Sequence, residues 1–292
     1  PVFSSGVVFK NLILNSNDEI KNSILPEIIT GDKIGTFAIY ENDKYSIDHD
    51  NLHTNLVKNS EGYVLNGTKK YVMFGDVSDY FAILAKYNDS FKMILLSKGS
   101  EGLDIKETTS LDQTRPMCEL SMSDIKIEEH HIMIESSDTL DVWEKVKNIA
   151  LSFLAMEQVG GSQACLDMST TYAKERIQFG KPIASFQLIQ KKLAEMITEI
   201  TKAQLLTFRL GQLKNEERAT SPQISMAKRN NVDIALKVAR EARQIHGAMG
   251  IMNEYSVMRH MANLESVITY EGTHDIHLLI TGQDITGIQA FS

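Results

Sequence analysis

The chain has 292 residues, 42% hydrophobic and 23% charged, the composition of a globular protein with room for two ordinary domains. Its net charge of -8 argues against nucleic-acid binding, which needs a basic face. Two separate cysteines indicate neither a disulfide framework nor a zinc site, and the absence of a signal peptide or an apolar run of ~18 residues predicts a cytoplasmic protein, or one of the mitochondrial matrix in a eukaryote, with no membrane partner.

The first half of the chain has the pattern of strands, after a short helical start. Residues 1–30 look helical, like the end of a larger helical domain, and residues 31–137 form the predicted β domain. Short apolar runs separated by turn residues are typical of a small antiparallel barrel or sandwich. The runs lie at 33–39, 62–65, 80–84 and 91–96, and the turn clusters at 66–68, 87–90 and 99–102.

From residue 138 onward the apolar residues follow a helical period. Between 186 and 200 they recur at spacings of three and four, which places them on one face of a helix, and the segments 142–172 and 224–245 show the same pattern. Residues 138–292 are therefore predicted to form an antiparallel bundle of four or five helices, and the fold class is α+β. Prolines and glycines mark expected helix starts (Pro182, Pro222) and helix ends (Gly180, Gly250).

Four segments of the helical half resemble the acyl-CoA dehydrogenase family in their order and spacing. They read YAKERIQFGKPI at 172–183, QIHGAMG at 244–250, RHMANLE at 259–265 and TYEGTHDIH at 269–277. The last two segments, with ITGIQAF at 285–291, are similar to glutaryl-CoA dehydrogenase in particular. The resemblance covers roughly residues 140–292 and is weaker over the β domain. It implies FAD as cofactor and an acyl-CoA as substrate.

Glu271 is the expected catalytic base. Removal of a proton next to a thioester carbonyl needs a carboxylate in an apolar, water-poor site, where its pKa can rise. Glu271 sits between apolar Ile268 and small Gly272, at a predicted helix start. By itself it reads as an ordinary acid at a helix N-terminus. The resemblance assigns it removal of the α-proton, while the β-hydride passes to the flavin.

The resemblance also implies a set of cofactor contacts. Two of them, Arg176 and Gln187, would serve the FAD of a neighbouring subunit, which implies a homo-oligomer arranged as a dimer of dimers. Taken alone, each residue of this set is also explained as a solvated, core or helix-capping residue. The expected FAD contacts are Arg176, Phe179, Gln187, Gln244, Gly247, Gly250, Thr273 and Tyr71.

His274 and His277 stand three residues apart near a helix start. A metal site is the less favoured reading, because no third ligand is evident nearby, and no metal is expected. The β domain departs from the family where flavin and CoA contacts are usual: Tyr40-Glu41-Asn42 stands in place of Thr-Glu-Pro, and Tyr71-Val72-Met73 in place of Trp-Ile-Thr. Met73 removes a hydroxyl, whereas Tyr71 retains a ring able to stack on the flavin.

Three functions remain open from the sequence. The first is FAD-dependent dehydrogenation of an acyl-CoA, of the glutaryl type with decarboxylation as the leading subtype, with electrons passing to an electron-transfer flavoprotein. The second is a flavin-dependent oxidase or monooxygenase on the same fold. The third is a non-catalytic subunit that binds flavin or acyl-CoA within a hetero-oligomer. Retention of Glu271 favours the first over the third.

Overall fold

The computed structural model describes residues 2–41, 51–60, 62–110, 115–134 and 139–290. The chain divides into two compact units, Pro1–Ala150 and Leu151–Ser292. The division falls inside helix α3 (Thr139–Glu175), which begins beside the boundary that the sequence analysis places at 137/138. Each unit has its own apolar core.

The first unit begins with helical structure, as predicted. A π-helical segment (Val2–Phe9) leads into α1 (Lys10–Leu14), and α2 (Asp18–Thr30) follows. Asn17 caps α2, because its side-chain oxygen accepts a hydrogen bond from the Ile20 amide at 2.9 Å. Gly31, at φ 80°, ends this helix in the left-handed conformation that glycine adopts readily.

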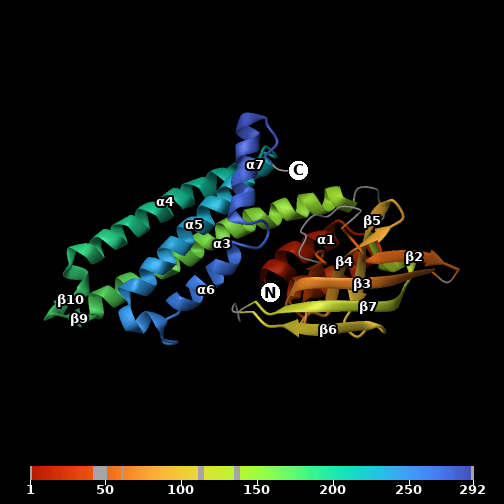
Figure 1. The fold of residues 1–292 in the computed structure, drawn as a ribbon, viewed down its shortest axis with the longest axis horizontal. Coiled ribbons are helices and arrows are strands. Elements are labelled where there is room, and N and C mark those ends of the chain that lie inside the picture. The colour runs from red at the N-terminus through yellow and green to blue at the C-terminus, as the bar shows by residue number, and fades with distance from the viewer. Residues whose placement is uncertain (1, 42–50, 61, 111–114, 135–138, 291–292) are drawn as a thin grey trace. The chain divides into compact units, whose positions relative to one another are not determined.

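Within the described residues, the β domain is one sheet of eight strands, shown in orange to yellow-green in Figure 1. The strand order is β6-β7-β3-β2-β4-β5-β8, with β1 attached to β4. Most neighbours are antiparallel, but β4 pairs in parallel with both β1 and β2, so the predicted antiparallel domain contains two parallel pairs. The strands are β1 (Gly35–Ala38), β2 (Asn55–Asn59), β3 (Gly62–Met73), β4 (Tyr80–Tyr87), β5 (Ser90–Ser97), β6 (Leu103–Thr108), β7 (Met117–Ile127) and β8 (Ile132–Ile134).

The predicted turn at 66–68 is wrong. These residues lie inside β3, where the register against β7 shifts between Leu65 and Gly67, so the glycine marks a bulge. Gly67 has φ 149°, and a Cβ there would lie 2.6 Å from the Cα of Thr54. Close backbone approach therefore explains this glycine. The predicted turn at 87–90 connects the paired strands β4 and β5, and the predicted turn at 99–102 leads from β5 to β6, which do not pair with each other.

The second unit is an antiparallel helical bundle, as predicted (Figure 1). Helix α5 (Ser221–Ile245) packs against α4, α6 and α7, and residues from α3 to α6 form the core, including Cys165, Ile200, Ala239 and Leu264. No helix in the described part of the chain combines the length and apolar character that a membrane span requires. The helices beside α3 are α4 (Gln187–Asn215), α5 (Ser221–Ile245), α6 (Val257–Val267) and α7 (His274–Thr286).

Helix ends differ from the expected ones at three positions. Only Pro222 lies in the first turn of a helix, at the start of α5. Pro182 ends a two-residue strand pair, β9 (Ile177–Gln178) with β10 (Lys181–Pro182), and Gly180 lies in the turn between them. Gly250 lies within a short 3-10 helix after α5, where a Cβ would be 2.2 Å from the carbonyl oxygen of Arg243.

Candidate active site

Glu271 lies in the short connection between α6 and α7, in the second unit. Its φ of 54° is in the left-handed region, and Gly272 follows at φ 94°. For a residue with a Cβ this conformation is strained, and such strain persists only where surrounding contacts enforce it. The connection is closed by backbone hydrogen bonds, including one from the His274 amide to the Ile268 carbonyl at 3.2 Å. The Glu271 side chain is half-buried.

Lys228, a buried lysine of α5, donates hydrogen bonds to the backbone of this connection. The Nζ of Lys228 donates to the carbonyl oxygens of Val267 (3.0 Å), Tyr270 (3.1 Å) and Gly272 (2.8 Å). An ammonium has three donors, so all of them are used. Burial lowers the pKa of Lys228 to about 8, against the attraction of the Glu271 carboxylate, which raises it. The lysine is therefore mostly protonated at neutral pH.

His277, in the first turn of α7, is a second side chain that donates to this connection. Its Nε2 lies 3.1 Å from the Glu271 carbonyl oxygen, and the ring is only 2% exposed. A Cβ at Gly272 would lie 2.7 Å from this Nε2, so the imidazole reaches the carbonyl only because residue 272 is glycine. Within the described residues, no group of three or more His, Cys, Asp or Glu is arranged to hold a metal ion.

Thr273 has the capping geometry that was its simpler reading. Its hydroxyl oxygen accepts a hydrogen bond from the Ile276 amide at 3.3 Å, which makes it the N-cap of α7. Two of the predicted site residues, Glu271 and Thr273, are thus brought together in one connection. The hydroxyl keeps its own O–H, so capping does not prevent it from donating to a ligand.

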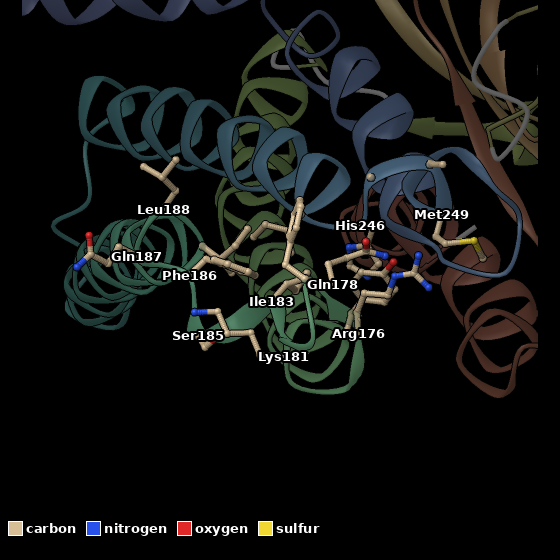
Figure 2. Close-up of a pocket in the computed structure, with 16 residues that line it drawn as sticks. Arg176, Gln178, Lys181, Ile183, Ser185, Phe186, Gln187, Leu188, His246 and Met249 are labelled. Carbon is tan, nitrogen blue, oxygen red and sulfur yellow. The ribbon is translucent and has the colours of Figure 1, made fainter.

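A second set of predicted residues surrounds a hollow of about 970 Å³ in the same unit (Figure 2). Arg176 and His246 lie toward one end of this hollow, and Gln187 and Leu188 toward the other. Two of the lining residues are buried and stacked, because the His246 ring lies on Tyr172 at a centroid distance of 4.4 Å. Of the predicted FAD contacts, four line the hollow: Arg176, Phe179, Gln187 and Gly247.

The residues of the hollow fit an elongated anionic ligand with a flat group. Arg176 and Lys181 bring positive charge, and Phe179 exposes 91% of its surface, unusual for a large aromatic side chain unless another molecule covers it. A Cβ at Gly247 would meet nothing within 4 Å, so the backbone there is open to a ligand. This combination is compatible with a dinucleotide such as FAD.

Gln244 and Gly250, like Thr273 and Tyr71, do not line this hollow. Gln244 accepts a hydrogen bond from Lys192 at 2.9 Å, within a cluster that includes the Lys192–Glu241 ion pair. Gly250 is buried and has the packing reason given above. These geometries supply a structural reason for each residue without a cofactor.

Tyr71, the last predicted contact, belongs to the β unit. It lies where the β3–β7 register shifts, with φ 57° and its side chain 41% exposed. Met73, two residues on, is buried, and its carbonyl oxygen accepts a hydrogen bond from the Thr36 hydroxyl at 2.8 Å. The β unit therefore presents the ring of Tyr71 outward and retains Met73 in its core.

Two residues before Tyr71 in β3, Lys69 forms a buried ion pair that was not predicted from the sequence. Lys69 donates to Glu41 at 2.8 Å and to the Ile39 carbonyl at 2.9 Å, and the lysine side chain is fully buried. Glu41 also accepts from the amides of His53 and Thr54. Burial raises the pKa of Glu41, but Lys69 and these amides outweigh it and lower the value overall. The departure from the family at 40–42 thus retains a carboxylate with a clear structural partner.

Lys228 also escaped the sequence analysis, although a signal was present. It lies four residues after Ile224, on the apolar face predicted for 224–245, and a lysine on a buried face needs a partner. His277 was considered only as a metal ligand or a polar helix residue. The carbonyls that these two side chains hold are not visible in a residue pattern.

Comparison with known proteins identifies the family. The acyl-CoA dehydrogenase C-terminal domain matches residues 152–286, and the acyl-CoA dehydrogenase middle domain matches residues 36–125. A short-chain-specific acyl-CoA dehydrogenase of Megasphaera elsdenii is 30% identical over 270 residues, which cover 90% of this chain and 70% of the relative. The CarC subunit of the caffeyl-CoA reductase-Etf complex of Acetobacterium woodii is 29% identical over 283 residues, 92% of this chain and 73% of that protein.

Solved structures agree with this result. The crystal structure of glutaryl-CoA dehydrogenase from Mycobacterium smegmatis matches all of this chain and 76% of that chain, with 33% identity and a TM-score of 0.93. A glutaryl-CoA dehydrogenase of the same organism in complex with FADH2 matches equally well, with 32% identity over the same shares of both chains. This chain belongs to the acyl-CoA dehydrogenase family, an FAD-dependent family of enzymes that act on acyl-CoA thioesters.

Proposed function

We propose that this chain catalyses α,β-dehydrogenation of an acyl-CoA thioester with Glu271 as the base. The observation that supports this role is the strained backbone of Glu271, which is kept in place by two buried donors, Lys228 of α5 and His277 of α7. The Glu271 carboxylate takes the α-proton as the Cα–H bond breaks. The Cβ–H bond breaks with loss of a hydride, and a carbon–carbon double bond forms between the two atoms. The chemistry that bound FAD would supply is that of a hydride acceptor.

The hollow in the helical unit is the proposed place for part of the cofactor. Arg176 would pair with the diphosphate, Gln187 would contact the adenine side, and Phe179 would pack on the cofactor. In this proposal Arg176 and Gln187 serve the FAD of a neighbouring subunit, while Tyr71 would stack on the flavin and Thr273 would donate its hydroxyl. Gln244 and Gly250 remain proposed contacts, supported by the resemblance alone.

The base is tested by anaerobic addition of butyryl-CoA and glutaryl-CoA to the flavin-loaded protein. We expect bleaching of the flavin in the wild type and a loss of at least about 10³-fold in its rate in Glu271→Gln, since the amide cannot take the proton. Glu265→Gln, on the exposed end of α6, is the matched control and should bleach normally. Normal bleaching by Glu271→Gln would exclude this residue as the base.

Sharing of the cofactor between subunits is tested with mixed oligomers. Arg176→Ala and Glu271→Gln are each expected to be inactive alone, one for loss of FAD affinity and one for loss of the base. In a mixed dimer, purified with two different tags, one site receives both defects and the other receives neither. About half of the wild-type activity per dimer is therefore expected. If Arg176 served its own subunit, each site would carry one defect and no activity would return.

Oligomerisation also has support in exposed apolar side chains on two helices. Leu205 and Phe208 of α4 are 65% and 67% exposed, and Ile285 of α7 is 79% exposed. Large apolar surfaces of this kind are usually covered by a partner. We propose a dimer of dimers, and light scattering on the flavin-loaded protein should give four times the chain mass. A monomer that binds flavin tightly would contradict the proposal.

The substrate and the electron acceptor are the remaining parts of the proposal. Similarity to glutaryl-CoA dehydrogenase at 259–277 and 285–291 supports the glutaryl type with decarboxylation, tested by release of ¹⁴CO₂ from carboxyl-labelled glutaryl-CoA. Bleaching by butyryl-CoA without CO₂ from glutaryl-CoA would favour a straight-chain enzyme. We propose an electron-transfer flavoprotein as acceptor, in line with the Etf complex of the CarC relative.

A further inference from the structure

The backbone around Glu271 has an unusual density of side-chain donors. Three consecutive carbonyls, those of Tyr270, Glu271 and Gly272, each accept a hydrogen bond from a buried side chain. Lys228 takes the first and third, and His277 takes the middle one. The carbonyls therefore have fixed directions on both sides of the Glu271 Cα atom, and those directions set the path of its side chain.

We propose that Lys228 and His277 are positioning residues for the Glu271 carboxylate. The inference rests on the proposed role of Glu271 as base. Neither side chain needs to touch the substrate, because each acts through the peptide groups that flank Glu271. Together they enforce the left-handed conformation at residue 271, from which the carboxylate projects.

The two donors are themselves held by well-ordered parts of the bundle. Lys228 lies on the buried face of α5, next to the fully buried Ala227 and close to Asn231, whose amide donates to the Ala155 carbonyl at 2.9 Å. His277 follows the Thr273 cap by four residues and has no freedom to swing outward, since it is buried against Gly272. A rigid second layer of this kind is what precise placement of a catalytic group requires.

A purely structural role accounts for only part of the geometry. The contact of Lys228 with Val267 satisfies a carbonyl in the last turn of α6, as a capping lysine does. The contacts with Tyr270 and Gly272 lie beyond the helix and flank the strained residue. A cap of α6 has no need of His277, which comes from a different helix.

The test compares variants that keep or remove a donor. His277→Gln retains an N–H able to reach a carbonyl, whereas His277→Leu has similar bulk and no donor. Lys228→Met retains the length of the side chain without the charge. Each flavin-loaded full-length variant is mixed with butyryl-CoA. Both the rate of flavin bleaching and the dissociation constant of butyryl-CoA are measured. Exchange of the thioester α-hydrogens with D₂O, followed by mass spectrometry after prior reduction of the flavin, reports on proton removal alone.

We expect His277→Leu and Lys228→Met to lose about 10- to 100-fold in both bleaching and α-exchange, because a shift of ~1 Å in a catalytic group has effects of this size. The dissociation constant of butyryl-CoA should stay within about threefold, and His277→Gln should stay close to wild type in every assay. Hydrogen exchange of the peptide covering 265–277 should quicken in the two donor-free variants and remain slow in His277→Gln.

Equal rates in His277→Leu and His277→Gln would overturn the proposal, as would losses that track substrate affinity or global melting. If Lys228→Met does not fold, the His277 pair decides by itself. Failure of the base assignment gives a different result: Glu271→Gln would then keep its α-exchange, while hydrogen exchange at 265–277 would still report on the two donors.

Discussion

Among the residues that the structure describes, each unit contains one fully buried lysine, and the two are satisfied in different ways. In the β unit, Lys69 pairs with the Glu41 carboxylate at 2.8 Å and with one carbonyl. In the helical unit, Lys228 donates to three backbone carbonyls around the Glu271 connection. Burial lowers the pKa of both lysines to about 8.

The two lysines differ in their acceptors: a carboxylate neutralises the charge of Lys69, whereas Lys228 donates to backbone carbonyls. The β pair neutralises itself, so its main effect is to join the 39–41 segment to β3, next to the outward-facing Tyr71. The charge of Lys228 faces three carbonyl dipoles, and it also attracts the carboxylate of Glu271, the proposed base. A buried ammonium can thus organise either a fold or a site, depending on its acceptors.

The largest expected effect is on the β pair. Lys69→Met leaves the Glu41 carboxylate buried without its cation and should lower the free energy of unfolding by about 3–5 kcal/mol. The double variant Glu41→Gln/Lys69→Met should lose less than the single one, because no buried charge remains. Trp143, the single tryptophan, packs on Phe37 in this unit, so its fluorescence in a urea titration measures the loss. A double variant that loses the sum of the two single losses would contradict this account.

The second effect is a pH dependence shared by both lysines. Between pH 8 and the ordinary lysine pKa of 10.5, the unfolded chain holds a proton that the folded chain has released. Stability contributed at each lysine should therefore rise with pH through this window, by about 3 kcal/mol at most. Urea titrations of wild type and Lys228→Met at pH 7.5, 8.5 and 9.5, followed by helical circular dichroism, should diverge in this direction. Parallel pH profiles would rule it out.

Acid should distinguish the two lysines. The lowered pKa of Glu41 means that its contribution is present above its ordinary value of 4.5 and is lost as the pH falls through its value in the fold. The β unit should therefore lose this stability in acid, as reported by Trp143. Glu41→Gln is the control. It has no carboxylate to protonate at this position, so its free energy of unfolding should change less as the pH falls.

Sequence periodicity predicted the helical bundle well and the sheet only in part. The apolar stripes at 142–172 and 224–245 became α3 and α5, because helical period and amphipathicity are local properties. Strands β2, β6, β7 and β8 were not predicted. Strand pairing is non-local, and β6 is only six residues long with none of them buried, so its apolar alternation is short.

The site follows the same rule. Glu271 and Thr273 were found in one short motif, and the structure places them in one connection. Lys228 reaches Gly272 across 44 residues, and Lys69 reaches Glu41 across 28, so no local pattern joins either pair. The acceptors of Lys228 are backbone carbonyls, which every residue has, so no residue type marks them in the sequence. A lysine on a predicted apolar face was the available signal.

The smallest expected effect concerns the caps, one in each unit. Thr273→Ala removes the acceptor for the Ile276 amide and should lower the stability of the helical unit by about 1 kcal/mol, with Thr273→Ser restoring it. Asn17→Ala removes the cap of α2 in the other unit. If Thr273 also donates its hydroxyl to FAD, its alanine variant should raise the FAD dissociation constant about fivefold, the equivalent of one hydrogen bond, while Asn17→Ala leaves it unchanged. An equal rise in both variants would attribute the change to stability, and no rise in either would leave Thr273 with its capping role alone.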